Sequence, residues 1–154
     1  MEAVLADKER YLGLAVAQAR QGMEAGGVPI GAVLVDSATG AVVGAGHNQR
    51  VQLGSATRHG EIDALEKAGR QPAAVYARSV LFTTLSPCSM CSGAVLLYKI
   101  PVVVVGENET FMGEEELLEA RGVRVVRMDD AACKDMMRRF IAEHSEVWNE
   151  DIGV

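Results

Sequence analysis

The sequence of 154 residues has few cysteines, no excess of basic residues and no long apolar run. Its three cysteines are an odd number, which disfavours a framework of disulfide bonds. Residues 1–7 lack the basic and apolar pattern of a signal peptide, and no apolar run approaches the length of a membrane span. These absences predict a cytoplasmic protein with no membrane partner.

Basic residues are in the minority. Lys and Arg number 15 against 21 Asp and Glu, and the formal net charge is −6. Proteins that bind nucleic-acid backbones need clustered Lys and Arg. The nearest approach to such a cluster, Lys134 with Arg138 and Arg139, is expected to be a solvated helix face. The composition therefore argues against a nucleic-acid partner.

The composition that remains is that of an ordinary globular protein, 49% hydrophobic and 23% charged. The length suits one domain that can bury a core. No internal repeat, low-complexity stretch or linker interrupts it. We expect a single domain over residues 1–154.

Hydrophobic periodicity predicts alternating helices and strands. Helices are expected over 6–23, from His59 to about Lys67 with Thr57 as a cap, over 88–98 with Ser86 as a cap, over 114–120, and from an Asp129 cap to about His144. Strands are expected over 28–36, 41–46, 79–84, 101–105 and 123–127, with a turn at 37–40 and a loop at 51–57. One hairpin followed by this alternation predicts an α/β fold, a mixed sheet covered by helices on both faces.

Two short motifs carry the chemistry. His59-Gly60-Glu61 has the form H-x-E, and Pro87-Cys88-Ser89-Met90-Cys91 has the form P-C-x-x-C. One imidazole and two thiolates are three zinc ligands. Structural zinc sites usually close all four positions with protein ligands, whereas catalytic sites keep one open for water. The motifs therefore predict a catalytic Zn²⁺ held by His59, Cys88 and Cys91.

Both motifs are expected at helix starts, where unpaired N–H groups and the positive end of the helix dipole favour thiolates. Glu61 is the candidate proton shuttle, taking a proton from water and delivering it to a ring nitrogen and later to the leaving amine. Backbone N–H groups of Gly60 and Cys88 are candidates to bind the carbonyl edge of a substrate.

Each motif alone has a plainer interpretation. A C-x-x-C pair also occurs in redox and structural zinc sites, and H-x-E on a helix is common. A non-catalytic module stabilised by zinc would need a fourth protein ligand, and no further Cys or His is well placed. The combination of the two motifs at two helix starts favours catalysis.

Further motifs extend over most of the chain, from about Val28 to Val154. They are Gly27-Val28-Pro29-Ile30-Gly31, Gly46-His47-Asn48, Gly54-Ser55-Ala56-Thr57, His59-Gly60-Glu61-Ile62, Thr83-Thr84-Leu85-Ser86-Pro87-Cys88, Val105-Gly106-Glu107-Asn108 and Trp148-Asn149-Glu150-Asp151-Ile152-Gly153. With these motifs the chain resembles the cytidine-deaminase-like zinc hydrolases, and within them the small cytosine deaminases of the fungal type.

The resemblance implies a three-layer α/β/α fold with a five-stranded mixed sheet, and a homodimer. It implies the same zinc ligands and the same role for Glu61. It also implies that Asn48 contacts the pyrimidine edge and that Asp151 accepts a hydrogen bond from the exocyclic amine. Phe111 and Trp148 would wall the pocket, and Ile30 and Leu85 would line it.

The chain departs from the fungal pattern in two places. The stretch Met112 to Glu116 is one residue shorter and more acidic, and Asn149 stands where the family carries an aromatic residue. The first departure bears on access to the site. The second bears on ring packing or on which small amine fits.

The substrate stays open at this point. The resemblance favours a small-molecule nucleobase, with cytosine converted to uracil and ammonia. Other small ring amines, such as isocytosine, guanine, a triazine or creatinine, need the same attack chemistry. A tRNA adenosine deaminase shares the metal motifs, but such an enzyme should present Lys and Arg beside its site and usually carries Ala at the position of Gly60.

Overall fold

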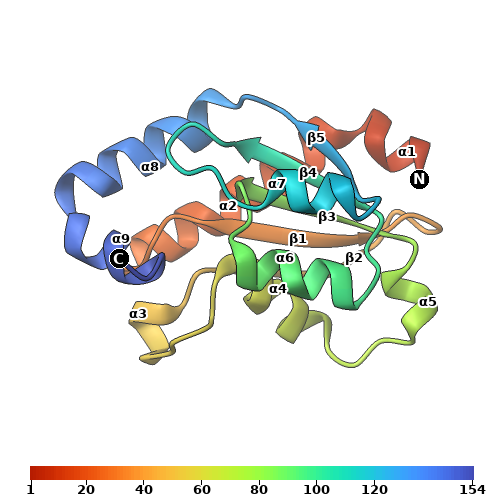
Figure 1. Cartoon of the computed structure of the whole chain (residues 1–154), viewed down its shortest axis with the longest axis horizontal. Helices are drawn as coiled ribbons and strands as arrows, with labels where there is room; N and C mark the ends of the chain where they lie inside the picture. Colours follow the sequence, from red (N-terminus) through yellow and green to blue (C-terminus); the bar gives the residue numbers. More distant parts are fainter.

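The computed structural model describes residues 1–154 as a five-stranded sheet between two layers of helices (Figure 1). The strands are β1 (Gly31–Asp36), β2 (Val42–His47), β3 (Ser79–Leu85), β4 (Val102–Glu107) and β5 (Arg124–Arg127). Their order across the sheet is β2-β1-β3-β4-β5. The predicted α/β/α architecture with a mixed sheet is confirmed.

The sheet has an antiparallel half and a parallel half. Strand β1 pairs antiparallel with both β2 and β3, whereas β4 pairs parallel with both β3 and β5. The two parallel connections pass through α6 (Ser89–Leu97) and α7 (Glu115–Ala120). Right-handed crossovers that step in one direction place their helices on one face of the sheet, and α6 and α7 share a face.

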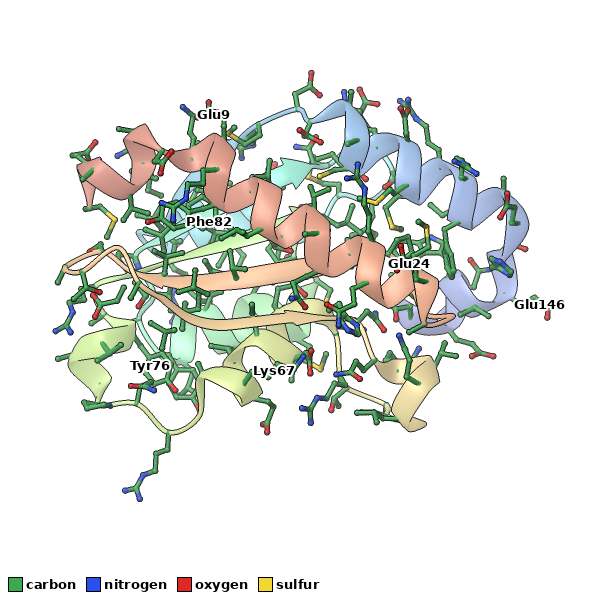
Figure 2. All side chains as sticks on the ribbon, turned by 180° about the vertical axis from the view of Figure 1, so that it is seen from behind. Glu9, Glu24, Lys67, Tyr76, Phe82 and Glu146 are labelled. Carbon is green, nitrogen blue, oxygen red and sulfur yellow. The ribbon has the colours of Figure 1, made fainter.

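Two layers of helices cover the sheet (Figure 2). One face packs against α1 (Glu2–Ala6), α2 (Lys8–Glu24) and α8 (Ala131–Glu143). The other packs against α4 (Gly60–Ala68), α5 (Ala73–Tyr76), α6 and α7. Alternate residues of β1 serve the two cores, with Val33 and Val35 on the first side and Ala32 and Leu34 on the second. No helix has both the length and the apolar character needed to cross a bilayer.

Helix boundaries differ from prediction where local contacts decide them. The helix expected over 6–23 is α2, which begins at Lys8, and the short helices α1, α3 (Arg50–Leu53), α5 and α9 (Ser145–Asp151) were not predicted. The expectation of a loop over 51–57 was wrong for residues 51–53, which belong to α3. Segments of one or two turns are too short to display a helical period. Strand β1 begins at Gly31, three residues later than the periodicity indicates.

All three predicted helix caps were wrong. His59 itself, not Thr57, precedes α4, and Cys88, not Ser86, precedes α6. Asp130 caps α8 by accepting from the Cys133 N–H at 2.9 Å. Asp129 has a φ of 53° in the left-handed region and does not cap. These caps depend on backbone geometry that the order of residues does not reveal.

The pairing of the strands gathers several chain segments at one edge of the sheet. Because β1 runs antiparallel to β2 and β3, its beginning lies beside their ends, as the pairs Gly31–His47 and Ala32–Thr83 show. Strand β4 ends at the same edge, with Glu107 opposite Leu85. Ligands of α/β proteins bind at the carboxyl ends of strands, and this edge holds the motif residues.

Candidate active site

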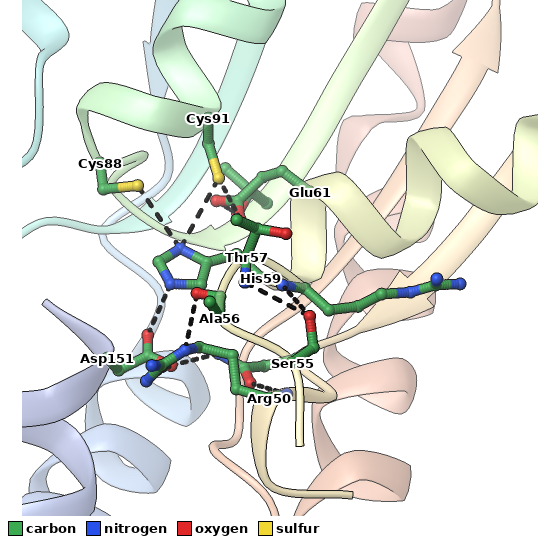
Figure 3. Close-up of polar contacts among 12 residues, drawn as sticks. Arg50, Ser55, Ala56, Thr57, His59, Glu61, Cys88, Cys91 and Asp151 are labelled. Carbon is green, nitrogen blue, oxygen red and sulfur yellow. Dashed lines mark hydrogen bonds and ion pairs between the residues drawn. The ribbon is translucent and has the colours of Figure 1, made fainter. Parts of the chain in front are cut away.

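The two metal motifs meet because two helices begin at the same edge of the sheet. His59 directly precedes α4 and Cys88 directly precedes α6, both in extended backbone geometry. Cys91 lies in the first turn of α6. Figure 3 shows the His59 ring between the two sulfurs on one side and the Asp151 carboxylate on the other.

The three ligand atoms have a spacing that fits zinc. His59 Nδ1 lies 3.4 Å from Cys88 Sγ and 3.8 Å from Cys91 Sγ, and all three atoms lie within 4.8 Å of one another. A tetrahedral zinc with ordinary Zn–S and Zn–N bond lengths separates its S and N ligands by about 3.6 Å. The donors and their spacing therefore fit Zn²⁺ with no rearrangement of the backbone.

The surroundings already favour a thiolate at Cys88. Its pKa is lowered to about 4, first by the hydrogen bond from Cys91 and further by His59. Burial lowers the pKa of His59, but the hydrogen bond with Cys88 and the charges of Asp151 and Glu61 outweigh it and raise that pKa to about 9. The same Cys88 interaction, together with burial, raises the pKa of Cys91. Metal binding would therefore release protons from His59 and Cys91.

Glu61 faces the metal ligands from inside the first turn of α4. It is buried; its Oε1 accepts from the Thr83 hydroxyl at 2.8 Å and its Oε2 from the Cys91 thiol at 3.3 Å. Burial, followed by the negative charge of Cys88, raises the pKa of Glu61. A raised pKa makes this carboxylate a better proton acceptor, as a group that moves protons in a reaction requires.

Asp151 links the C-terminal helix α9 to this site. Its Oδ2 lies 3.4 Å from His59 Nε2, and its Oδ1 accepts from Asn48 Nδ2 at 2.7 Å. Arg50 lies 3.7 Å from the same oxygen. Burial raises the pKa of Asp151, with His59 and Asn48 acting in the opposite direction. Metal-bound histidines generally donate their second ring N–H to an oxygen acceptor, which fixes the ring.

A small cavity lies between these groups. Its volume is about 20 Å³. Its lining residues are Ile30, His59, Glu61, Leu85, Ser86, Cys88, Phe111, Trp148, Asp151 and Ile152. The Phe111 and Trp148 rings meet edge to face with centroids 5.8 Å apart. The largest hollows of the molecule lie elsewhere, between α2 and α8 and between α4 and α6, and contain no zinc ligand.

The predicted substrate residues divide into two groups. Ile30, Leu85, Phe111, Trp148 and Asp151 line the cavity. Asn48 and Gly60 lie behind the lining: Asn48 is fully buried, and its Oδ1 accepts from the Arg50 N–H at 3.1 Å. Asn149 is exposed on α9 and does not line the cavity.

Sequence reasoning missed three residues of the site. Ser86 and Ile152 line the cavity, and Thr83 holds Glu61. Ser86 and Thr83 lie in the motif Thr83 to Cys88, but nothing in that pattern separates them from ordinary strand residues. Ile152 lies in the motif Trp148 to Gly153, but nothing in that motif indicates a role for Ile152 itself.

An α/β/α sandwich with one histidine, two cysteines and a carboxylate at two helix starts defines the class of zinc-dependent hydrolases. The profile of the family described as the cytidine and deoxycytidylate deaminase zinc-binding region matches residues 5–107. The chain belongs to this family, and the predicted resemblance is confirmed.

Characterised relatives include both nucleobase and tRNA enzymes. A cytosine deaminase of Candida albicans is 49% identical over 147 residues, which cover 96% of this chain and 97% of the relative. A tRNA-specific adenosine deaminase 2 of Xenopus tropicalis is 35% identical over 122 residues, 74% of this chain and 71% of the relative.

Solved structures show the same fold. A structure from studies of tRNA:A34 deaminases has a TM-score of 0.70 and 26% identity, covering 83% of this chain and 99% of the other. A guanine deaminase from Nitrosomonas europaea has a TM-score of 0.67 and 27% identity, covering 86% and 83%.

Proposed function

We propose that residues 1–154 form a single deaminase domain that converts free cytosine and water to uracil and ammonia. The observation that carries this proposal is the small cavity, in which apolar and aromatic walls face His59, Cys88 and Glu61. Walls of this kind suit one flat ring. The near full-length similarity to the Candida cytosine deaminase supports the same substrate.

The walls define how the ring would lie. Phe111 and Trp148 would cover it, with Ile30 and Leu85 beneath and beside it. Asp151 would accept a hydrogen bond from the exocyclic amine, since a carboxylate has room for more acceptor contacts than Asn48, His59 and Arg50 use. Asn48 and the Gly60 N–H would meet the opposite polar edge once the ring occupies the site.

Glu61 would move the protons of the reaction. Zinc held by His59, Cys88 and Cys91 would polarise water for attack on the ring carbon that carries the amine. Glu61 would accept one proton from this water and pass it to the neighbouring ring nitrogen. It would then take the remaining proton of the attacking oxygen as the carbonyl forms, and deliver this proton to the amine as the C–N bond breaks. Thr83 would hold the carboxylate in place through its 2.8 Å hydrogen bond.

Substrate entry requires the wall of the cavity to move. A volume of about 20 Å³ has room for about one water molecule, which is less than a pyrimidine needs. Trp148, Asp151 and Ile152 all come from α9 or directly after it, so displacement of this C-terminal segment would open the cavity.

The test is ammonia release from cytosine by the zinc-loaded protein, with the Glu61→Ala variant as the blank. Turnover by the wild type alone supports the proposal. Zinc binding without turnover would reject cytosine and keep the chemistry for another small ring amine. Guanine, isocytosine, a triazine and creatinine should be assayed in parallel, because a guanine deaminase shares this fold.

The similarity to tRNA-specific adenosine deaminases supports a second candidate function. Against it, α9, which supplies Trp148 and Asp151 to the cavity, also carries Glu146 and Glu150, whereas a polynucleotide would need cations. If the protein deaminates a tRNA anticodon stem-loop, with activity that falls steeply as salt rises, then tRNA and not cytosine is the substrate. Absence of tRNA binding at low salt would eliminate it.

The apolar groove between α4 and α6 supports a homodimer. Its volume is about 590 Å³, and Leu97 at its rim is 70% exposed. Met90, Leu65 and Tyr98 also line it. A second copy of the chain placed across a two-fold axis would bury this surface on both partners at once.

Analytical ultracentrifugation of the wild type and Leu97→Asp tests the dimer. The wild type is expected to sediment as a dimer at micromolar concentration and Leu97→Asp as a folded monomer. A monomeric wild type, or a dimer indifferent to the substitution, would place the interface elsewhere or remove it.

A further inference from the structure

The segment after β4, residues 108–114, is hydrogen-bonded to residues 86–87, which directly precede Cys88. Residues 108–114 contain Phe111, which faces Trp148 at the cavity. The Glu114 N–H donates to the Pro87 carbonyl at 2.9 Å, and the Gly113 N–H donates to the Ser86 hydroxyl at 2.9 Å. A Cβ atom at position 113 would lie 2.0 Å from the Pro87 carbonyl oxygen, so the contact tolerates only glycine.

A buried carboxylate lies at the centre of this junction. Glu115 is 2% exposed. Its Oε1 accepts from the Ser86 hydroxyl at 2.8 Å, and its Oε2 accepts from Arg127 Nε at 2.6 Å and Asn108 Nδ2 at 3.3 Å. Its partners come from the ends of β3, β4 and β5, so one side chain joins three strand ends.

The charge of Glu115 orients the Ser86 hydroxyl. An ionised carboxylate is only an acceptor, so Ser86 must donate its single O–H to Glu115. Its lone pairs are then free to accept from the Gly113 N–H. Ser86 lines the cavity and lies two residues before Cys88, so this orientation is passed from α7 to the edge of the site.

A glutamine in place of Glu115 would disturb this pattern without changing its shape. If the amide oxygen faced Ser86, the amide N–H groups would oppose the N–H donors of Arg127 and Asn108. If the amide were turned, its oxygen would accept from Arg127 and Asn108, and its N–H would donate to the second lone pair of Ser86. The first arrangement leaves donors facing donors, and the second turns the Ser86 O–H away from its present acceptor.

We propose that Glu115 is a positioning residue of the deaminase site, which acts through Ser86 and Gly113 to hold Phe111 over the cavity. The beginning of the same segment is held separately, because Glu107 accepts from the N–H groups of Glu109 and Thr110 at 2.8 and 3.0 Å. Loss of the Glu115 contacts therefore loosens the Phe111 wall without detaching the whole segment. The kinetic part of the test rests on the proposed function.

Trp148 offers a readout that is independent of turnover. It is the chain's single tryptophan, it is 5% exposed, and it contacts Phe111. In Glu115→Gln we expect its emission to shift to the red and its quenching by acrylamide to increase several-fold. Zinc content should stay as in the wild type, because the ligands are unchanged.

The matched control is Glu119→Gln. Glu119 also pairs with Arg127, at 3.0 Å, but its side chain is 45% exposed and has no contact with Ser86. This variant should leave Trp148 emission and kinetics as in the wild type. Effects equal to those of Glu115→Gln would assign the result to the Arg127 ion pair and overturn the proposal.

Kinetics separate positioning from a purely structural role. In Glu115→Gln the KM for cytosine should rise about tenfold with kcat changed by less than about threefold, because binding of the ring and not proton transfer is affected. Ser86→Ala, which keeps the Glu115–Arg127 pair, should raise KM similarly. The double variant should be no worse than either single one, because both remove the same link.

Unchanged quenching and unchanged KM in Glu115→Gln would refute the proposal. If Glu115→Gln does not fold, Ser86→Ala decides alone, and the absence of any effect of Ser86→Ala on Trp148 emission and quenching would overturn the proposal. If the wild type does not deaminate cytosine, the proposed function fails, and the Trp148 measurements still test the link from Glu115 to the wall.

Discussion

Glu61 and Asp63 lie two residues apart on α4, both buried, yet they point into different surroundings. Glu61 faces the cavity, with a hydroxyl and a thiol as its partners. Asp63 projects from another side of α4, where Arg58 Nε and Lys67 Nζ each lie 2.9 Å from one of its oxygens. Residues spaced by two project from different sides of a helix.

The pKa values of the two carboxylates are shifted in opposite directions. Burial raises the pKa of Glu61, and the charge of Cys88 adds to it. Burial also tends to raise the pKa of Asp63, but its hydrogen bonds with Arg58 and Lys67 prevail and lower it. Burial alone therefore does not set the direction of the shift; the hydrogen bonds from Arg58 and Lys67 set it for Asp63, and Glu61 has no Arg or Lys partner. Asp63 instead ties the loop of residues 47–58 to α4, accepting from the His47 N–H and from Gln49.

Exchange of Glu61 for glutamine should give the largest effect on activity. Because the proposed role of Glu61 is that of base and then acid, kcat for cytosine is expected to fall by at least about 10³-fold. The fold and the zinc content should be retained. Asp63→Asn, the paired control on the same helix, should keep kcat within about tenfold. Comparable losses in both variants, measured by ammonia release, would abolish the distinction drawn between them.

Loss of the metal should lower the stability of the zinc site that Glu61 faces. Cys88→Ala is expected to bind almost no zinc and to unfold at a lower temperature, because the metal joins the starts of α4 and α6. Dialysis of the wild type against a chelator should lower its Tm in the same way. Metal analysis and thermal unfolding test this, and a fully stable, zinc-loaded Cys88→Ala would contradict the ligand assignment.

Asp63→Asn should lower the free energy of unfolding by about 2 kcal/mol at neutral pH, which is within the range for hydrogen bonds to a charged group. The folded-state pKa of Asp63 lies below its ordinary value of 3.8, so its stabilisation is fully present above that value. It is lost as the pH falls through the folded-state pKa. Urea unfolding at pH 7 and pH 3 should show the gap between wild type and variant narrowing at the lower pH. A gap that widens there would reverse the assigned sign.

Gly60→Ala should give the smallest change. A Cβ at this position would lie 3.0 Å from the Ile30 carbonyl oxygen, which also accepts from the Asn48 N–H at 2.9 Å. A shift of a few tenths of an ångström would relieve the contact and displace Asn48 slightly. We expect a rise in KM of a few-fold with kcat nearly unchanged. A wild-type KM would show that Asn48 is not sensitive to this contact.

The layers of the fold could be predicted because apolar periodicity reflects burial directly. Strands such as Val102–Glu107 are buried along their whole length, and the helix over Ala131–Glu143 buries one face of Cys133, Met136, Met137 and Phe140. Helix caps and short helices could not be predicted, because they depend on which polar groups the tertiary structure brings near them. Ser86 was expected to cap a helix and instead donates to Glu115, 29 residues away.

The meeting of His59, Cys88 and Cys91 was predictable because zinc binding demands particular residue types at short, fixed spacings, and the catalytic role of Glu61 stays a prediction. The structure brings the three ligand atoms within 4.8 Å of one another, as the motifs indicate. The roles of Asn48, Gly60, Asp151, Phe111 and Trp148 in substrate binding stay predictions. Thr83 and Glu115 carried no signal, since their importance arises from contacts made across strands.

By itself the sequence determined the class of chemistry, because ligand identity and local spacing decide which metal can be held and which carboxylate can move a proton. It also determined the layered α/β architecture, since burial imposes its period on the chain. Only the tertiary structure decided which carboxylate meets cations and which meets the cavity, because side chains that are distant in the chain set each electrostatic environment. The small cavity likewise exists only where Ile30 before β1, the end of β3, the starts of α4 and α6, the 108–114 segment and α9 converge.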